Sequence, residues 1–195
     1  MVFKNKLSKN NKYINIHNSD KIISLLSQRG FDIDVYYLSG RVIEIGFRTY
    51  IKEGCLKEDI SYKVLSSDDN DNIYSLIVIE GNNEKRYSFT IATLYDVLSK
   101  IGVQFVKVRR PIALKNAKYL VSRLKTARAN MEVTYIKGRI AFIDIDKGDR
   151  LAFISKPGLY TISEPYQLRC SELDSRFVYG HAMKILDILK YYNYI

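Results

Sequence analysis

Short runs in which apolar and polar residues alternate predict a protein built largely from β-strands. In the first half they cover residues 33–38, 41–51, 60–65, 73–80 and 85–89, and in the second half 131–136, 139–146, 150–155 and, more weakly, 159–163. Turn-forming residues such as Ser39-Gly40 and Gly148 separate the runs. Because strands joined by short turns pair antiparallel, the pattern predicts antiparallel sheets.

Apolar residues at helical spacing predict four helices, at residues 19–29, 91–101, 112–128 and 182–192. Gly30 follows the first helix as a stop signal, and Pro111 stands where it can begin the third. One arc of the third helix gathers its apolar side chains, which are Ala113, Leu114, Ala117, Leu120, Val121 and Leu124. A helix docked through that arc would hold its lysines and arginines toward solvent.

Two segments of the chain have similar sequences. Residues 34–45 read DVYYLSGRVIEI and residues 132–143 read EVTYIKGRIAFI, with five identities over the aligned stretch. Each segment follows a predicted helix, and each half closes with another. We interpret this as a duplicated α–β-meander–α unit of the α+β class, with helices on one face of each sheet. The expected organisation is a basic arm at residues 1–18, a first repeat at 19–106 and a second at 107–195 that begins with the basic helix.

This element order, a duplicated meander closed by a helix, is similar to the outline of two families. They are the TATA-binding proteins and the Whirly-type single-stranded DNA binders. The similarity is confined to element order and implies no functional residue, because neither family's sequence motifs occur in the chain.

Positive charge is concentrated in two stretches. The formal net charge is +10, yet residues 101–141 hold ten bases and a single acid, Glu132. The first twelve residues add Lys4, Lys6, Lys9 and Lys12 with no acid. Segregated positive charge is typical of phosphate binding, so we predict a protein that binds nucleic acid. The predicted phosphate contacts are Lys107, Arg109, Arg110, Lys115, Lys118, Arg123, Lys125, Arg128, Lys137, Arg139 and Arg41. Arg41 and Arg139 each follow a turn glycine at equivalent places in the two hairpins.

Other interpretations of the charge stay open. The basic helix face could serve solubility alone, or it could dock on an acidic protein partner, as an accessory or host-modulating protein would. Abundant Lys, Asn, Ile and Tyr fit an AT-rich coding sequence, such as a viral one. Neither DNA versus RNA nor strandedness can be read from phosphate contacts. The duplicated chain is compatible with a monomer or a homodimer.

Catalytic chemistry has little support in the sequence. Strand acids Asp32 with Asp34, and Asp144 with Asp146, would each share a face, which is the minimum for binding Mg²⁺ in a nuclease. Phosphate-loop, metalloprotease, hydrolase and dinucleotide motifs do not occur. We therefore expect a protein that is not an enzyme, with a Mg²⁺-dependent nuclease as a lesser alternative.

The remaining composition gives no sign of a cofactor, a metal or secretion. Cys55 and Cys170 are too far apart for a zinc pair, and His17 and His181 are isolated. No signal peptide and no apolar run of spanning length occurs, so we expect an intracellular protein, cytoplasmic or nuclear. Exposed rings could stack on bases, but Tyr36, Tyr37, Phe47, Tyr50, Tyr135 and Phe142 occupy strand positions where packing is the commoner role.

Overall fold

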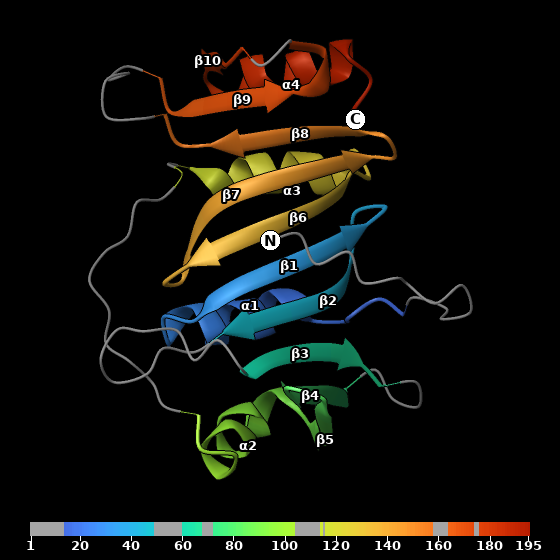
Figure 1. The fold of residues 1–195 in the computed structure, drawn as a ribbon, viewed down its shortest axis with the longest axis vertical. Coiled ribbons are helices and arrows are strands. Elements are labelled where there is room, and N and C mark those ends of the chain that lie inside the picture. Colours follow the sequence, from blue (N-terminus) through green and yellow to red (C-terminus); the bar gives the residue numbers. More distant parts are fainter. Residues whose placement is uncertain are drawn as a thin grey trace.

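Ten antiparallel strands form one continuous sheet in the described part of the chain (Figure 1). The computed structural model describes residues 14–48, 60–67, 72–103, 114, 116–157, 164–173 and 176–195. The first half contributes β1 (Asp32–Leu38), β2 (Arg41–Arg48), β3 (Ile60–Ser66), β4 (Tyr74–Glu80) and β5 (Asn83–Phe89). The second contributes β6 (Asn130–Ile136), β7 (Arg139–Lys147), β8 (Arg150–Ser155), β9 (Tyr166–Cys170) and β10 (Val178–Gly180).

The strand order is symmetric about the middle of the sheet. It runs β10-β9-β8-β7-β6-β1-β2-β3-β4-β5, so each half forms a meander that leads outward from the centre. At the centre β1 pairs with β6, with Val35 opposite Val133. We expected one sheet in each half; that expectation is corrected, because the exposed edges of β1 and β6 satisfy each other's hydrogen bonds and join the halves.

The helices pack on one face of this sheet. They are α1 (Ser19–Gln28), α2 (Leu94–Lys100), α3 (Ala117–Thr126) and α4 (Ala182–Tyr191), with short 3₁₀ turns at Ile91–Thr93 and Ser171–Leu173. In Figure 1, α1 and α3 lie behind the central strands, while α4 and α2 lie toward the two ends of the sheet. In the described residues, none of the helices has the length and apolarity needed to cross a membrane.

The core lies between the helices and the sheet. Alternate residues of each strand point inward, as Ile33, Val35 and Val133 do at the centre, and all three are fully buried. Leu26 of α1 and Leu120 of α3 meet them from the helix side, and the buried apolar side chains of both halves form one cluster. Each such side chain contributes about 1.5–3 kcal/mol, so packing rather than helix propensity fixes these short helices.

Each central hairpin turn is held by the other half of the chain. The backbone N–H of Ser39 donates to the side chain of Asn130, and the backbone N–H of Lys137 donates to the side chain of Asp32, both at 2.7 Å. The two contacts use corresponding positions. The donors Ser39 and Lys137 are 98 residues apart, and so are the acceptors Asp32 and Asn130. The two contacts are therefore reciprocal.

The turn glycines allow this approach. Gly40 and Gly138 both have a left-handed backbone, with φ of 75° and 77°. A Cβ on Gly40 would overlap the carbonyl oxygen of Lys125 near the end of α3, and a Cβ on Gly138 would overlap that of Ser27 near the end of α1. Only a glycine both adopts this conformation cheaply and leaves the space for the helix backbone.

The expected helix at residues 112–128 begins too early and ends slightly too late. Its described part is α3, Ala117–Thr126, while residues 111–113 and 115 lie outside the described part of the chain. Asn116 is left-handed, and the N–H of Leu114 donates to the carbonyl of Ile140 at 2.9 Å instead of joining a helix. Arg128 also has a left-handed backbone, which ends the helix that precedes it.

The outer strands of the second half were the least predictable. The weak strand expected at residues 159–163 lies outside the described residues, and β9 and β10 were missed. β10 has three residues, too few to show an alternating pattern. The other expected strands and helices are found, with ends displaced by a few residues. Cys170 is a buried free thiol on β9, and Cys55 lies outside the described residues.

Replacing Gly138 by alanine should destabilise the protein far more than the same change at Gly148. Both glycines have φ of 77°, but a Cβ on Gly148 meets nothing within 4 Å. We expect Gly148→Ala to lower the free energy of unfolding by about 1 kcal/mol, the cost of the left-handed backbone. Gly138→Ala should cost about 3 kcal/mol, because overlap with α1 adds to it. Equilibrium urea unfolding measures both, and equal losses would contradict the proposed close contact.

Candidate nucleic-acid interface

α3 presents bases to solvent along the side that faces away from the sheet. Lys118 and Arg123 are exposed, Lys125 is half-buried, and the helix contains no acid. The opposite side is buried through Ala117, Leu120, Val121 and Leu124, which matches the described part of the apolar arc predicted from the sequence. α1, which also lies behind the central strands, carries one acid and one base, so the two helices differ in charge.

At the end of α3, three predicted residues surround the β1–β2 turn. Lys125 is partly engaged, because its Nζ lies 3.5 Å from the Asp20 carboxylate and 5.7 Å from the centre of the Tyr37 ring. Arg128 is exposed and lies two residues after the end of α3. The turn packs against the backbone of Arg128, which brings the exposed Arg41 to the same end of α3.

At the start of α3, two other predicted residues line a groove. Lys118 and Arg139 lie on its walls, together with Tyr119, Tyr135, His181 and Met183. The groove has a volume of about 740 Å³ and lies between the start of α3, the β6–β7 turn and the start of α4. We refer to it as the α3–α4 groove. It does not include Arg41, Lys125 or Arg128, so the predicted bases are divided between the two ends of α3.

The walls of the α3–α4 groove combine positive charge with apolar and aromatic surface. Tyr119 and Met183 are about half exposed, and the Tyr119 hydroxyl lies 3.3 Å from the Met183 sulfur. Burial and the charge of Asp20 raise the pKa of Tyr135 to about 12, so this ring is a neutral phenol. An acid also lies beside the groove, since the Glu164 carboxylate is 3.7 Å from the His181 ring nitrogen. Neither Lys118 nor Arg139 has an ion pair among the described residues.

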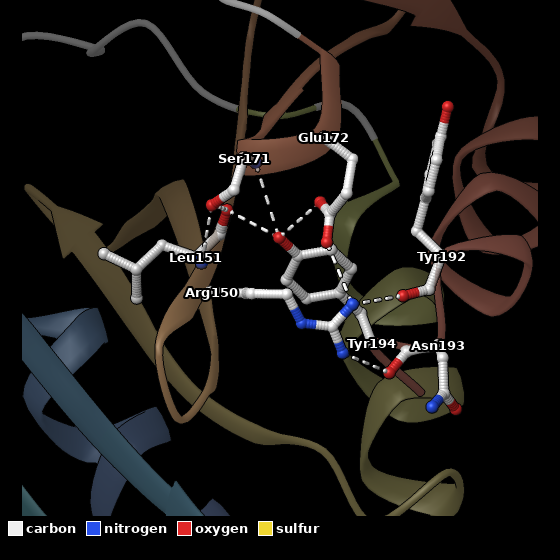
Figure 2. A network of polar contacts seen from close by, with 7 residues as sticks. All are labelled: Arg150, Leu151, Ser171, Glu172, Tyr192, Asn193 and Tyr194. Carbon is white, nitrogen blue, oxygen red and sulfur yellow. Dashed lines mark hydrogen bonds and ion pairs between the residues drawn. The ribbon is translucent and has the colours of Figure 1, made fainter.

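A polar network fastens the end of α4 and thereby positions one wall of the groove (Figure 2). The Arg150 guanidinium donates to the Glu172 carboxylate and to the carbonyl of Tyr192, both at 2.9 Å. The Tyr194 hydroxyl lies 2.8 Å from the same carboxylate and 3.0 Å from the carbonyl of Leu151. Burial opposes ionisation of Glu172, but the hydrogen bonds from Tyr194 and Arg150 outweigh it and lower its pKa.

The first half has a different set of charges at the positions that correspond to the groove. By the offset of the reciprocal contacts, Asp20 corresponds to Lys118, and Lys21 corresponds to Tyr119. Asp20 is paired with Lys125 of the other half. Arg41 and Arg139 do correspond, and both are exposed. The positive groove is therefore a property of the second half.

Acids occupy the centre of the opposite sheet face. In the described part of the chain no helix covers this surface, which we call the open face. Asp34, Glu132 and Asp144 point toward it from β1, β6 and β7, and we name these three the central acidic cluster. Burial and the charge of Asp34 raise the pKa of both Glu132 and Asp144. The negative charge of this cluster makes the centre of the open face unfavourable for phosphate.

Three of the four acids considered as Mg²⁺ ligands, Asp32, Asp34 and Asp146, are engaged by other partners. Asp32 accepts the Lys137 N–H, and Asp146 accepts the Gly148 N–H at 2.8 Å, so both serve turns. Asp34 is paired with Arg48 at 3.1 Å. In the residues that the structure describes, no three His, Cys, Asp or Glu side chains gather as metal ligands.

Most of the strand aromatics pack against their neighbours. Tyr37 and Phe47 are buried in the core, and Phe47 stacks on Tyr62 with ring centres 4.9 Å apart. Tyr36 and Phe142 are half-buried on the open face, and Phe142 stacks on Phe153. Tyr135 lines the groove, and Tyr50 lies outside the described residues.

Four of the predicted contacts fall outside the described part of the chain, and three residues of the groove were not predicted. Lys107, Arg109, Arg110 and Lys115 lie outside the described residues. Lys137 is half-buried at the β6–β7 turn, beside Arg139. Tyr119, His181 and Met183 were not anticipated, because their role follows from α3 and α4 lying side by side, which no local sequence pattern encodes.

No protein-family model, no curated protein and no solved structure matches the chain.

Neutralising Asp144 should stabilise the protein at high pH. A carboxyl whose pKa is raised on folding favours the folded state when protonated and opposes it once pH rises through the folded-state value. We expect Asp144→Asn to raise the free energy of unfolding by about 0.5 kcal/mol at pH 8, since Glu132 lies directly opposite. The gain should vanish below the ordinary aspartate pKa of 3.8. Urea unfolding across pH measures it, with the exposed Asp187→Asn on α4 as control; a gain that persists in acid would contradict the repulsion.

Glu172 should produce the opposite pH dependence. Its lowered pKa contributes stability that is present above the ordinary glutamate value of 4.5 and lost as pH falls through the folded-state value. We expect Glu172→Gln to lower the melting temperature at pH 7 and to flatten the decline of that temperature below about pH 4.5. Thermal unfolding followed by circular dichroism measures this. Parallel curves for the variant and the native protein would rule out the role given to Glu172.

Proposed function

We propose that this protein binds nucleic acid without catalysis and contacts phosphates through the helix side of its second half. The observation that carries the proposal is the charge of α3, which presents Lys118 and Arg123 to solvent and contains no acid, while the equivalent α1 is neutral. Lysines and arginines aligned on one surface bind a phosphate backbone by releasing its counterions. Solubility alone gives no reason for confining this charge to one of two equivalent helices.

The two hairpin turns would extend the contact surface. Arg41 and Arg128 lie at one end of α3, and Arg139 with Lys137 lies at the β6–β7 turn near the other. A nucleic-acid strand lying along α3 would meet lysine and arginine side chains over the whole length of the helix. The open face is the less favourable surface, since the central acidic cluster would repel phosphate there.

We also propose that the chain arose by internal duplication. The reciprocal turn contacts, the left-handed residues Asn18 and Asn116, and the bulges between Tyr36/Tyr37 and Thr134/Tyr135 all correspond at the same offset. In this interpretation the first copy retained a neutral helix while the second acquired the bases. The proposal supports looking for the ligand in the second copy.

Binding should depend on α3 and on salt. We expect a labelled 20-nucleotide strand to bind with log affinity falling linearly with log salt, measured by fluorescence anisotropy. Lys118→Gln with Arg123→Gln should weaken binding about tenfold and reduce the slope by about 1.4–1.8, since each lost contact removes about 0.7–0.9. Lys85→Gln, an exposed base on the distant β5, is the matched control and should change little.

Duplex DNA, single-stranded DNA and RNA of equal length identify the preferred polymer in the same assay. If none of them binds above the level of a generic basic protein, the proposal is wrong. The α3 charge would then serve an acidic protein partner, which would saturate at a fixed stoichiometry instead of following polymer length. If the Lys85 control weakens binding as much as the α3 pair, binding does not depend specifically on α3 and the contact surface is wrongly assigned.

A further inference from the structure

The α3–α4 groove has two kinds of wall that meet in one concave site. Lys118 and Arg139 provide positive charge, and neither is engaged in an ion pair among the described residues. Tyr119 and Met183 provide a half-exposed aromatic and thioether surface beside them. At about 740 Å³ the groove falls within the usual range for small-molecule sites.

We propose that the α3–α4 groove binds one unstacked nucleotide of the strand, with its phosphate held by Lys118 and Arg139 and its base against Tyr119 and Met183. This inference rests on the proposed function and adds a preference to it. A base can enter a groove only after leaving its stack, and this costs least in a single strand. The protein should therefore prefer single-stranded over duplex nucleic acid.

Both parts of a nucleotide are needed to account for these walls. A simple anion would contact Lys118 and Arg139 and leave Tyr119 and Met183 exposed to water. A neutral apolar ligand would use the ring and the thioether and leave Arg139 without a partner. A nucleobase stacked on a tyrosine adds affinity without requiring a particular sequence, and a phosphate adds charge-assisted hydrogen bonds from lysine and arginine.

The first half provides an internal comparison. Arg41 has the same place after its turn glycine as Arg139, and it is also exposed. The position equivalent to Lys118 is Asp20, whose carboxylate lies 3.5 Å from Lys125. An acid at this position would repel a phosphate. The nucleotide site is therefore expected in the second half alone, and Arg41 is a matched control for Arg139.

The test uses the full chain and small probes. Amide chemical shifts are followed in two-dimensional NMR spectra during titration with adenosine 5′-monophosphate, adenosine and inorganic phosphate. We expect the monophosphate to shift amides of α3, the β6–β7 turn and α4, with at least tenfold weaker binding of adenosine and of phosphate. Arg139→Gln should weaken monophosphate binding at least fivefold, and Arg41→Gln should leave it unchanged. Matching melting temperatures of both variants show that each is folded.

Several results would overturn the groove assignment. If phosphate binds as tightly as the monophosphate, the groove is a plain anion site. If adenosine binds as tightly as the monophosphate, Lys118 and Arg139 do not contribute to binding. Equal effects of Arg139→Gln and Arg41→Gln would remove the preference for the second half. Tyr119→Ala with unchanged monophosphate affinity would exclude base stacking there.

The groove and the proposed function can fail separately. If the 20-nucleotide strand binds with salt dependence but the monophosphate shifts no groove amide, the groove assignment is wrong and nucleic-acid binding stands. If the monophosphate binds in the groove but no polymer binds, the nucleic-acid function is wrong. Equal affinity for single strand and duplex would contradict the unstacked nucleotide.

Discussion

The pairing of β1 with β6 is the interaction on which the rest of the molecule depends. It joins two meanders into one sheet, and it places each central hairpin turn against the helix of the other half. The glycine at each turn lets the two backbones approach, and a side-chain acceptor from the other half satisfies the N–H beside it. Core, helices and groove all derive their positions from this reciprocal arrangement, because α1 and α3 are each fixed by both halves.

One scaffold thereby carries two surfaces of opposite character. The helix side of the second half gathers exposed bases, while the open face gathers acids that repel one another. The offset of the reciprocal contacts puts Asp20 where the second half has Lys118, so the two halves differ in charge at this position. The Arg150 network at the end of α4 further fixes the wall of the groove that the second half provides.

Much of this fold follows from local sequence patterns. Alternation identified β1, β2, β6 and β7 closely, since one face of each is buried and the other is solvated. The start of α3 was missed, because Asn116 adopts a left-handed backbone that a run of good helix formers conceals. The joining of the halves was missed too, since pairing between β1 and β6 depends on residues far apart in the chain.

The site was only partly predictable for the same reason. Charge spacing identified Lys118 and Arg139 as candidates, but it grouped them with Lys125 and Arg128, which the fold places at the other end of α3. Lys125 also turned out to be paired with Asp20, a residue of the first half with no sequence link to it. Tyr119 and Met183 approach each other only once α3 and α4 are packed together.

The central strand pair also has a consequence for synthesis on the ribosome. β1 is complete long before β6 emerges, and at about 5–20 residues per second the intervening chain takes several seconds to more than ten to appear. Throughout that interval β1 is an unprotected edge that can pair with the same strand of another nascent chain. Charged side chains on an edge strand disfavour such pairing, and β1 carries two of them, Asp32 and Asp34. The side chains that later support a turn and an ion pair would first keep neighbouring polypeptides on a polysome apart.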